Sequence, residues 1–247
     1  MFTKRIIMLA ALLAAFTLAV APTALAQDEY AAQREAMVDT LVAEGIITDE
    51  RVVAAMKTVP RDMFVPRGQI ASAYDDTPLP IGDDQLIYAP SIVGLMTEAL
   101  QAQETDRVLE VGTGSGYQAA ILAELARHVY TTEVLEALAV NTQARLQDMG
   151  YTKITVRNAD GHLGWPEHQP FDRIIVNCAA EEVPPALVDQ LKDGGRMVIP
   201  ISEEGGWAQK LYLMVKQGDE LVKTELADAI FVPMAKSAED AGEENAQ

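Results

Sequence analysis

Cysteine and histidine are scarce in this sequence, which contains one cysteine and three histidines. A single cysteine excludes an internal disulfide framework. Because Cys178 lies beside an apolar run, we interpret it as a small core residue rather than a nucleophile. The histidines, His128, His162 and His168, do not have the spacing of metal ligands. We therefore predict no metal site.

Positive charge is also scarce. The sequence has 19 lysines and arginines against 37 aspartates and glutamates, which gives a net charge of −18 at pH 7. So acidic a chain repels phosphate groups, and we expect neither a nucleic-acid partner nor binding to anionic membranes. The same charge disfavours highly acidic protein substrates.

Long apolar runs are absent after the first 26 residues. The one such run, Ile6–Val20, follows Lys4 and Arg5 and precedes Ala24–Ala26, which has the form of a cleavage site. We predict a secretory signal at residues 1–26, cleavage before Gln27 and a periplasmic or secreted protein without stable membrane association. A retained membrane anchor is the alternative, because the run is near the short limit for a span. Cleavage would change the net charge from −18 to −20, since the signal contains two basic residues and no acid.

Strands and helices alternate through most of what remains. We predict one domain at 27–235, a doubly wound, mostly parallel α/β sheet of the Rossmann-like kind, followed by a disordered acidic tail at 236–247. A hairpin around Gly218 and a closing strand at 229–233 are expected to add an antiparallel edge. The predicted strands of the alternating part are 107–111, 128–132, 154–157, 173–177 and 196–200, and its helices are 117–127, 135–149 and 184–191.

A helical cap is predicted before the sheet, with helices at 30–44 and 51–58. Two prolines bracket a segment at 59–66 that is expected to be extended. Residues 75–82 read as irregular, and a helix is expected at 90–103. The segment Leu79–Ala89 can fold over the carboxyl ends of the strands, where ligands bind in such sheets.

The chain is organised around residues 108–117, which read Val-Leu-Glu-Val-Gly-Thr-Gly-Ser-Gly-Tyr. An apolar run, alternate glycines and the start of a helical pattern indicate the first strand–turn–helix crossover of an open sheet. The carboxylate before the first glycine would repel a pyrophosphate but suits a cationic ligand such as S-adenosylmethionine. An ordinary glycine-rich turn is the alternative. Under the first interpretation, the cofactor-binding residues here are Glu110, Gly112, Thr113, Gly114, Ser115, Gly116 and Tyr117.

Two further acids are candidates for the same ligand. Glu133 ends the next predicted strand, where a carboxylate can accept hydrogen bonds from both ribose hydroxyls of an adenosine. A helix N-terminal acid is the alternative for this residue. Asp160 and Gly161 follow the third strand, where a carboxylate could meet the adenine amino group, and a plain Asp-Gly turn explains them equally well.

Motifs along the chain also carry a family resemblance. They stand in the family's order, and on them the sequence strongly resembles the protein-L-isoaspartate (D-aspartate) O-methyltransferases over about residues 35–234. The resemblance implies methyl transfer from S-adenosylmethionine to the α-carboxylate of isoaspartyl residues in damaged proteins, a first step of repair. The family is cytoplasmic by default, and a monomer is expected. The matching motifs are Val59-Pro60-Arg61, Phe64-Val65-Pro66, Leu79-Pro80-Ile81-Gly82, residues 109–119, Gly164-Trp165, Pro170-Phe171-Asp172, Ile174-Ile175-Val176, Pro184 with Ala186-Leu187, Gln190-Leu191, Gly194-Gly195 and Phe231-Val232-Pro233.

The segment that the resemblance assigns to substrate departs from the family pattern. The family reads Gly-Gln-Thr-Ile-Ser where residues 84–88 read Asp-Gln-Leu-Ile-Tyr. The resemblance therefore makes Tyr88 the catalytic residue, at the position of a serine, and Leu86, Ile87 and Ala89 substrate-binding residues. Two alternatives stay open: a methyltransferase with another carboxylate acceptor, and a non-catalytic module that binds damaged chains.

Overall fold

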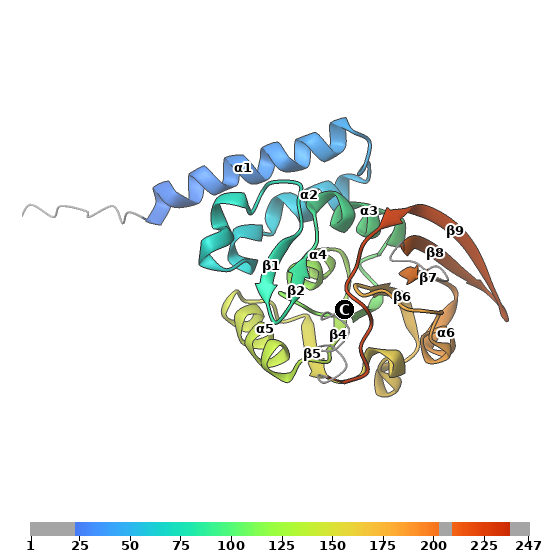
Figure 1. Ribbon diagram of the computed structural model, residues 1–247. Helices are drawn as coiled ribbons and strands as arrows, with labels where there is room; N and C mark the ends of the chain where they lie inside the picture. The colour runs from blue at the N-terminus through green and yellow to red at the C-terminus, as the bar shows by residue number, and fades with distance from the viewer. Residues whose placement is uncertain (1–22, 203–208, 238–247) are drawn as a thin grey trace, which may run out of the picture.

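The computed structural model describes residues 23–202 and 209–237 (Figure 1). Most of the predicted signal, residues 1–22, and most of the predicted acidic tail, residues 238–247, lie outside the described residues. Among the described helices, none combines the length and the apolar character that a membrane crossing requires.

The predicted α/β sheet is confirmed. Within the described residues, seven strands form a mixed sheet in the order β5-β4-β3-β6-β7-β8-β9. The five strands from β5 to β7 are parallel, while β8 and β9 are antiparallel to their neighbours and form the expected hairpin edge (Figure 1). The strands are β3 (Arg107–Val111), β4 (His128–Glu133), β5 (Ile154–Asn158), β6 (Phe171–Val176), β7 (Leu191–Ser202), β8 (Gln209–Gln217) and β9 (Glu220–Ala229).

Helices cover both faces of this sheet. Because successive strand residues point to opposite faces, Val108 of β3 belongs to the core that also contains residues of the N-terminal helices, whereas Leu109 and Val111 belong to a second core with Leu187. Figure 1 shows α1 and α2, which precede the sheet in the sequence, as a layer at one end of the molecule. The helices are α1 (Thr23–Ala43), α2 (Glu50–Thr58), α3 (Pro90–Leu100), α4 (Tyr117–Leu125), α5 (Glu136–Asp148) and α6 (Pro185–Gln190).

The segment at 59–66 is not extended as predicted. Between the two prolines lies a 3₁₀ turn, η1 (Arg61–Phe64), closed by a hydrogen bond from Met63 N–H to the Pro60 carbonyl at 3.0 Å. Residues three apart lie above one another in a 3₁₀ turn. The turn therefore places Arg61 and Phe64, both fully buried, on one side. The preference before a proline is kept, since Val59 and Val65 are both extended, and only the residues between them form the turn.

The predicted irregular segment contains a small hairpin instead. Strands β1 (Leu79–Gly82) and β2 (Gln85–Ile87) pair antiparallel across a turn at Asp83 and Asp84. Both aspartates have left-handed backbones, with φ of 50° and 54°. Aspartate tolerates this conformation better than most residues, so two acids close a turn that usually calls for glycine.

The predicted closing strand at 229–233 is also wrong. Strand β9 ends at Ala229, and the following residues make only an isolated bridge between Pro233 and Ala179. The carbonyl of Val232 accepts from Ala179 N–H and the N–H of Met234 donates to the Ala179 carbonyl, both at 2.8 Å. The pairing ends after this one bridge, and the next residue, Ala180, pairs with Ile201 of β7 instead. The segment instead crosses the carboxyl end of β6.

Candidate active site

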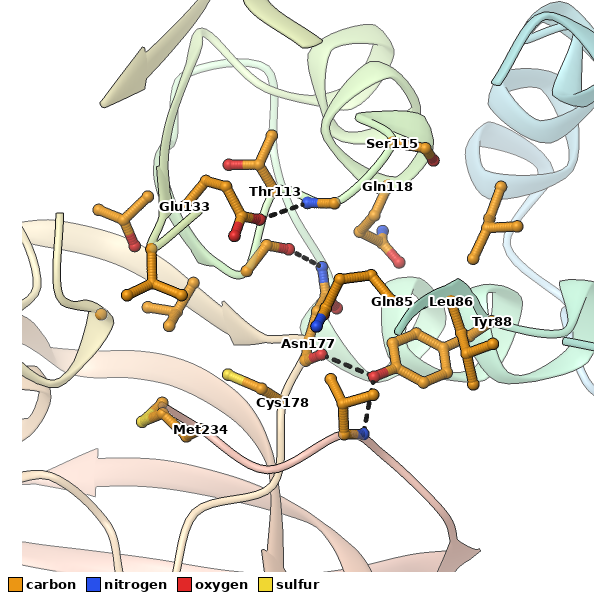
Figure 2. A pocket seen from close by; sticks show the side chains of 18 of the residues that line it. Gln85, Leu86, Tyr88, Thr113, Ser115, Gln118, Glu133, Asn177, Cys178 and Met234 are labelled. Atoms are coloured by element: carbon orange, nitrogen blue, oxygen red, sulfur yellow. Dashed lines mark hydrogen bonds between the residues drawn. The ribbon is translucent and has the colours of Figure 1, made fainter. Parts of the chain in front are cut away.

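A pocket opens at the carboxyl ends of β3, β4 and β6, and it encloses about 840 Å³ including its open mouth (Figure 2). Its walls come from the β1–β2 hairpin, α3, the glycine turn after β3 and the segment that follows β9. This is the position that the strand order of an open α/β sheet gives to a ligand. The lining residues are Gln85–Tyr88, Val93, Met96, Val111–Ser115, Tyr117, Gln118, Thr132–Val134, Ala159, Gly161, Asn177, Cys178 and Val232–Ala235.

The glycine turn forms one wall through its backbone. Gly112 and Gly114 have φ of 86° and 52°, which residues with side chains rarely adopt. The N–H groups of Gly112 and Thr113 both donate to the Thr132 carbonyl, at 2.9 and 3.1 Å. The turn is thus fixed to the end of β4 with bare backbone facing the pocket.

Glu133 lies directly beside this turn (Figure 2). Its Oε2 accepts from Gly114 N–H at 2.9 Å and its Oε1 from Leu135 N–H at 3.1 Å. Burial raises the pKa of Glu133, while the two N–H groups oppose that rise. Each carboxylate oxygen has a further lone pair, so Glu133 can still accept from a ligand in the pocket.

Glu110 does not line the pocket, contrary to its predicted place at the ligand. The side chain is fully buried, and its Oε1 accepts from Asn177 Nδ2 at 3.0 Å. Burial raises the pKa of Glu110 to about 8, against the effect of the Asn177 hydrogen bond. The reason is the alternation of β3, which directs Glu110 to the sheet face opposite to that of Val111, and Val111 is the residue that reaches the pocket.

Asp160 also lies outside the lining, although Gly161 belongs to it. Its carboxylate begins the short turn η3 (Gly161–Leu163) and accepts from both the backbone N–H and the ring of His162, at 2.8 Å each. At Gly161, a Cβ atom would lie 2.3 Å from Val111 Cγ1. The predicted pair therefore divides: Asp160 caps a turn, and Gly161 allows close approach at the pocket floor.

The rest of the glycine motif divides in the same way. Ser115 and Tyr117 line the pocket, but Gly116 does not. A Cβ at Gly116 would lie 2.7 Å from Thr142 Cγ2, so this glycine permits packing against α5. The ring of Tyr117 also lies under the buried guanidinium of Arg61, at 5.0 Å from its centroid.

In the predicted substrate segment, Leu86, Ile87 and Tyr88 line the pocket. Ala89 does not, because it stands at the start of α3, where its carbonyl accepts from Val93 N–H. The Tyr88 hydroxyl donates to the Asn177 carbonyl at 3.0 Å and accepts from Val232 N–H at 3.2 Å. Its single hydrogen is therefore already engaged by the chain itself.

Sequence reasoning missed several lining residues. Asn177 and Cys178 follow β6, and this position alone could have indicated them, since ligands bind at strand ends. Met234, after β9, gave no such signal. Cys178 is buried, as predicted for a core residue, and burial raises the pKa of its thiol. The raised pKa keeps the thiol protonated, and a protonated thiol is a weak nucleophile.

The residues present fit S-adenosylmethionine. Bare glycine backbone and the Glu133 carboxylate offer polar contacts. Three buried oxygens of lining residues, Tyr117 Oη, Gln118 Oε1 and Thr132 Oγ1, have no hydrogen-bond partner among the described residues. Methionine and valine side chains supply apolar wall. Within the part of the chain that the structure describes, no cluster of three potential metal ligands occurs.

Comparisons with known proteins agree with this geometry. The family model described as protein-L-isoaspartate (D-aspartate) O-methyltransferase matches residues 32–239. Protein-L-isoaspartate O-methyltransferase 2 of Shewanella sediminis is 44% identical over 217 residues, which cover 87% of this chain and 88% of that protein. The protein of the same name from Polaromonas is 50% identical over 187 residues, 75% of this chain and 88% of its own.

Solved structures give the same result. A protein-L-isoaspartate O-methyltransferase superposes with a TM-score of 0.76 at 27% identity, covering 82% of this chain and 66% of that one. A putative protein-L-isoaspartate O-methyltransferase from Plasmodium falciparum, solved with S-adenosyl-L-homocysteine, gives a TM-score of 0.73 at 25% identity over 83% of this chain and 99% of its own. The chain belongs to the protein-L-isoaspartate (D-aspartate) O-methyltransferase family.

Proposed function

We propose that this protein transfers a methyl group from S-adenosylmethionine to the α-carboxylate of L-isoaspartyl or D-aspartyl residues in damaged proteins, as a repair enzyme. One observation carries the proposal: the family match spans residues 32–239 and includes every residue that lines the pocket. Identities of 44% and 50% to proteins named for this activity support it.

The chemistry asks mainly for positioning. Bound S-adenosylmethionine supplies an electrophilic methyl group on a sulfonium sulfur. A substrate carboxylate is already ionised near neutral pH, so the protein needs no general base. Holding two reactants in line can lower the barrier by about 7–11 kcal/mol. The pocket can position both reactants, because its rigid glycine turn holds S-adenosylmethionine while the β1–β2 hairpin faces the substrate carboxylate.

Three parts of the pocket have separate tasks. Gly112 and Gly114 let a ligand approach the backbone, and Glu133 accepts hydrogen bonds from the ribose hydroxyls. Met96 and Met234 add apolar surface that excludes water from the reacting groups. Exclusion of water strengthens the polar contacts that remain.

We further propose that the substrate segment diverges from the family pattern. Leu86 offers no hydroxyl, and the Tyr88 hydroxyl is bonded to the backbone. A hydrogen bond to a charged group contributes about 1.5–3 kcal/mol. A missing donor to the substrate carboxylate therefore costs about one to two orders of magnitude in rate.

The test is methyl transfer from labelled S-adenosylmethionine to an isoaspartyl peptide, with the aspartyl peptide of the same sequence as control. Selective labelling of the isoaspartyl peptide is expected. Labelling of another carboxylate alone would indicate a different acceptor, and binding of S-adenosylhomocysteine without any transfer would indicate a binding module. A variant with Tyr88→Ser and Leu86→Thr tests the divergence through kcat at saturating peptide, and the divergence would be wrong if kcat were no higher.

Export is a separate proposal. The basic residues, the apolar run and the small-residue site at 24–26 support a signal removed before Gln27, which leaves the family match from residue 32 onward intact. The mature protein would then be a periplasmic or secreted monomer. Sequencing its N-terminus tests this: Gln27 is expected, and an intact Met1 in a soluble cytosolic fraction would contradict it.

A further inference from the structure

The phenol of Tyr88 connects two chain segments that lie far apart in the sequence. It donates to the Asn177 carbonyl at 3.0 Å, just after β6, and accepts from Val232 N–H at 3.2 Å, just after β9. The Tyr88 ring packs against Phe231 with centroids 4.4 Å apart. Figure 2 shows the ring beside Asn177, with its hydroxyl pointing at the backbone.

Asn177 extends this connection to the glycine turn. Its side-chain Nδ2 donates to Glu110 Oε1 at 3.0 Å and to the Gly112 carbonyl at 3.2 Å. One residue thus takes a hydrogen bond from Tyr88 on its backbone and gives two to the cofactor side of the pocket. The segment after β9, the β1–β2 hairpin and the glycine turn are therefore joined across the pocket.

The segment after β9 has backbone hydrogen bonds on either side of the Val232 N–H. Gln209 accepts from the Phe231 N–H and donates to the Phe231 carbonyl. Ala179 makes two hydrogen bonds to it, one with the Val232 carbonyl and one with the Met234 N–H. The Val232 N–H has Tyr88 as its partner, and Ile230 is 82% exposed. Without the phenol, this N–H would face the pocket unpaired, and the position of Val232–Ala235 over the pocket would depend on fewer contacts.

We propose that Tyr88 is a positioning residue, which clasps the segment after β9 to the end of β6 and so shapes the acceptor side of the pocket. We call the Tyr88 hydroxyl, the Asn177 carbonyl and the Val232 N–H the Tyr88 clasp. The hydroxyl does not act on the substrate carboxylate, because its hydrogen is donated to Asn177. This inference rests on the proposed function, since it assigns Tyr88 a role in binding the protein acceptor.

The test compares Tyr88→Phe with the wild type as full chains. The variant keeps the ring on Phe231 and removes both hydrogen bonds. We expect KM for the isoaspartyl peptide to rise about tenfold, the factor that 1.4 kcal/mol represents, while kcat changes less than threefold. Tyr74→Phe is the matched control: its hydroxyl bonds Asp62 outside the pocket lining, so KM should not change.

Hydrogen exchange provides a readout independent of activity. By NMR, the Val232 amide should exchange at least tenfold faster in Tyr88→Phe, whereas the Met234 amide, bonded to Ala179, should not change. A fall in kcat of a hundredfold at constant KM would show that the hydroxyl serves the reacting carboxylate and would overturn the proposal. Unchanged Val232 exchange would overturn it too. If the wild type methylates no isoaspartyl peptide, the proposed function fails, and the exchange result still decides whether the clasp exists.

Discussion

Gly114 offers the sharpest test of the cofactor site, through the variant Gly114→Val. Its φ of 52° is left-handed, and a Cβ there would have Ile81 Cδ1, at 3.7 Å, as its nearest neighbour. The protein itself therefore has room for the side chain, and the cost to folding is the backbone strain of about 1–3 kcal/mol. A typical domain stability of about 5–15 kcal/mol tolerates that loss.

Cofactor binding should lose more. To seat both a valine and a ligand, the turn must move, which breaks the charge-assisted bond from Gly114 N–H to Glu133, worth about 1.5–3 kcal/mol. It also strains the bond that the Thr142 hydroxyl donates to the Gly114 carbonyl at 2.7 Å, worth about 1 kcal/mol. Together these predict a loss of affinity of about 100- to 1,000-fold.

Titration calorimetry with S-adenosylhomocysteine measures this affinity, and urea unfolding measures stability. Gly150→Val is the matched control, because Gly150 has φ of 84°, no heavy atom within 4 Å of the point where a Cβ would lie, and no place in the pocket lining. Both variants should lose similar stability, and only Gly114→Val should lose affinity. Equal affinity in both variants would refute the assignment of the glycine turn to the cofactor.

Three further predictions concern the same pocket. Glu133→Gln keeps the shape but removes the charge, so affinity for S-adenosylhomocysteine should fall about tenfold by calorimetry, since hydrogen bonds to charged groups are about twice as strong; unchanged affinity would contradict ribose binding. The pKa of Glu110 is raised to about 8 from 4.5, so between these two pH values the folded state retains a proton that the unfolded state loses. The free energy of unfolding should therefore fall by up to about 5 kcal/mol as the pH rises from 4.5 to about 8, and the full stability is present below pH 4.5. Urea unfolding of Glu110→Gln should lack that slope, and parallel profiles would refute the raised pKa. In Gly161→Ala, the Cβ 2.3 Å from Val111 Cγ1 should lower stability by about 1–3 kcal/mol and weaken cofactor binding, and a melting temperature equal to that of the wild type would contradict the close packing.

The sequence by itself determined the α/β sheet and the place of the ligand. Alternating apolar strands and helices leave few topologies open, and the glycine turn after β3 marks the carboxyl edge where a ligand binds. Both depend on short-range pattern, because strand period, helix period and glycine conformations are local properties. The place of Glu133 in the pocket lining was predictable for the same reason, because it is an acid at the end of a strand next to that turn.

Tertiary structure alone decided which motif residues face the pocket. The alternation of β3 turns Glu110 away from it, Gly116 packs against α5, and Asp160 caps a turn, all through contacts that the motif itself does not specify. The role of Tyr88 has the same origin, because its hydroxyl is bonded to Asn177 and Val232, which lie 89 and 144 positions further along the chain. A sequence pattern identifies which side chain is present at a position. Only packing decides which atoms that side chain contacts, because its direction depends on everything folded around it.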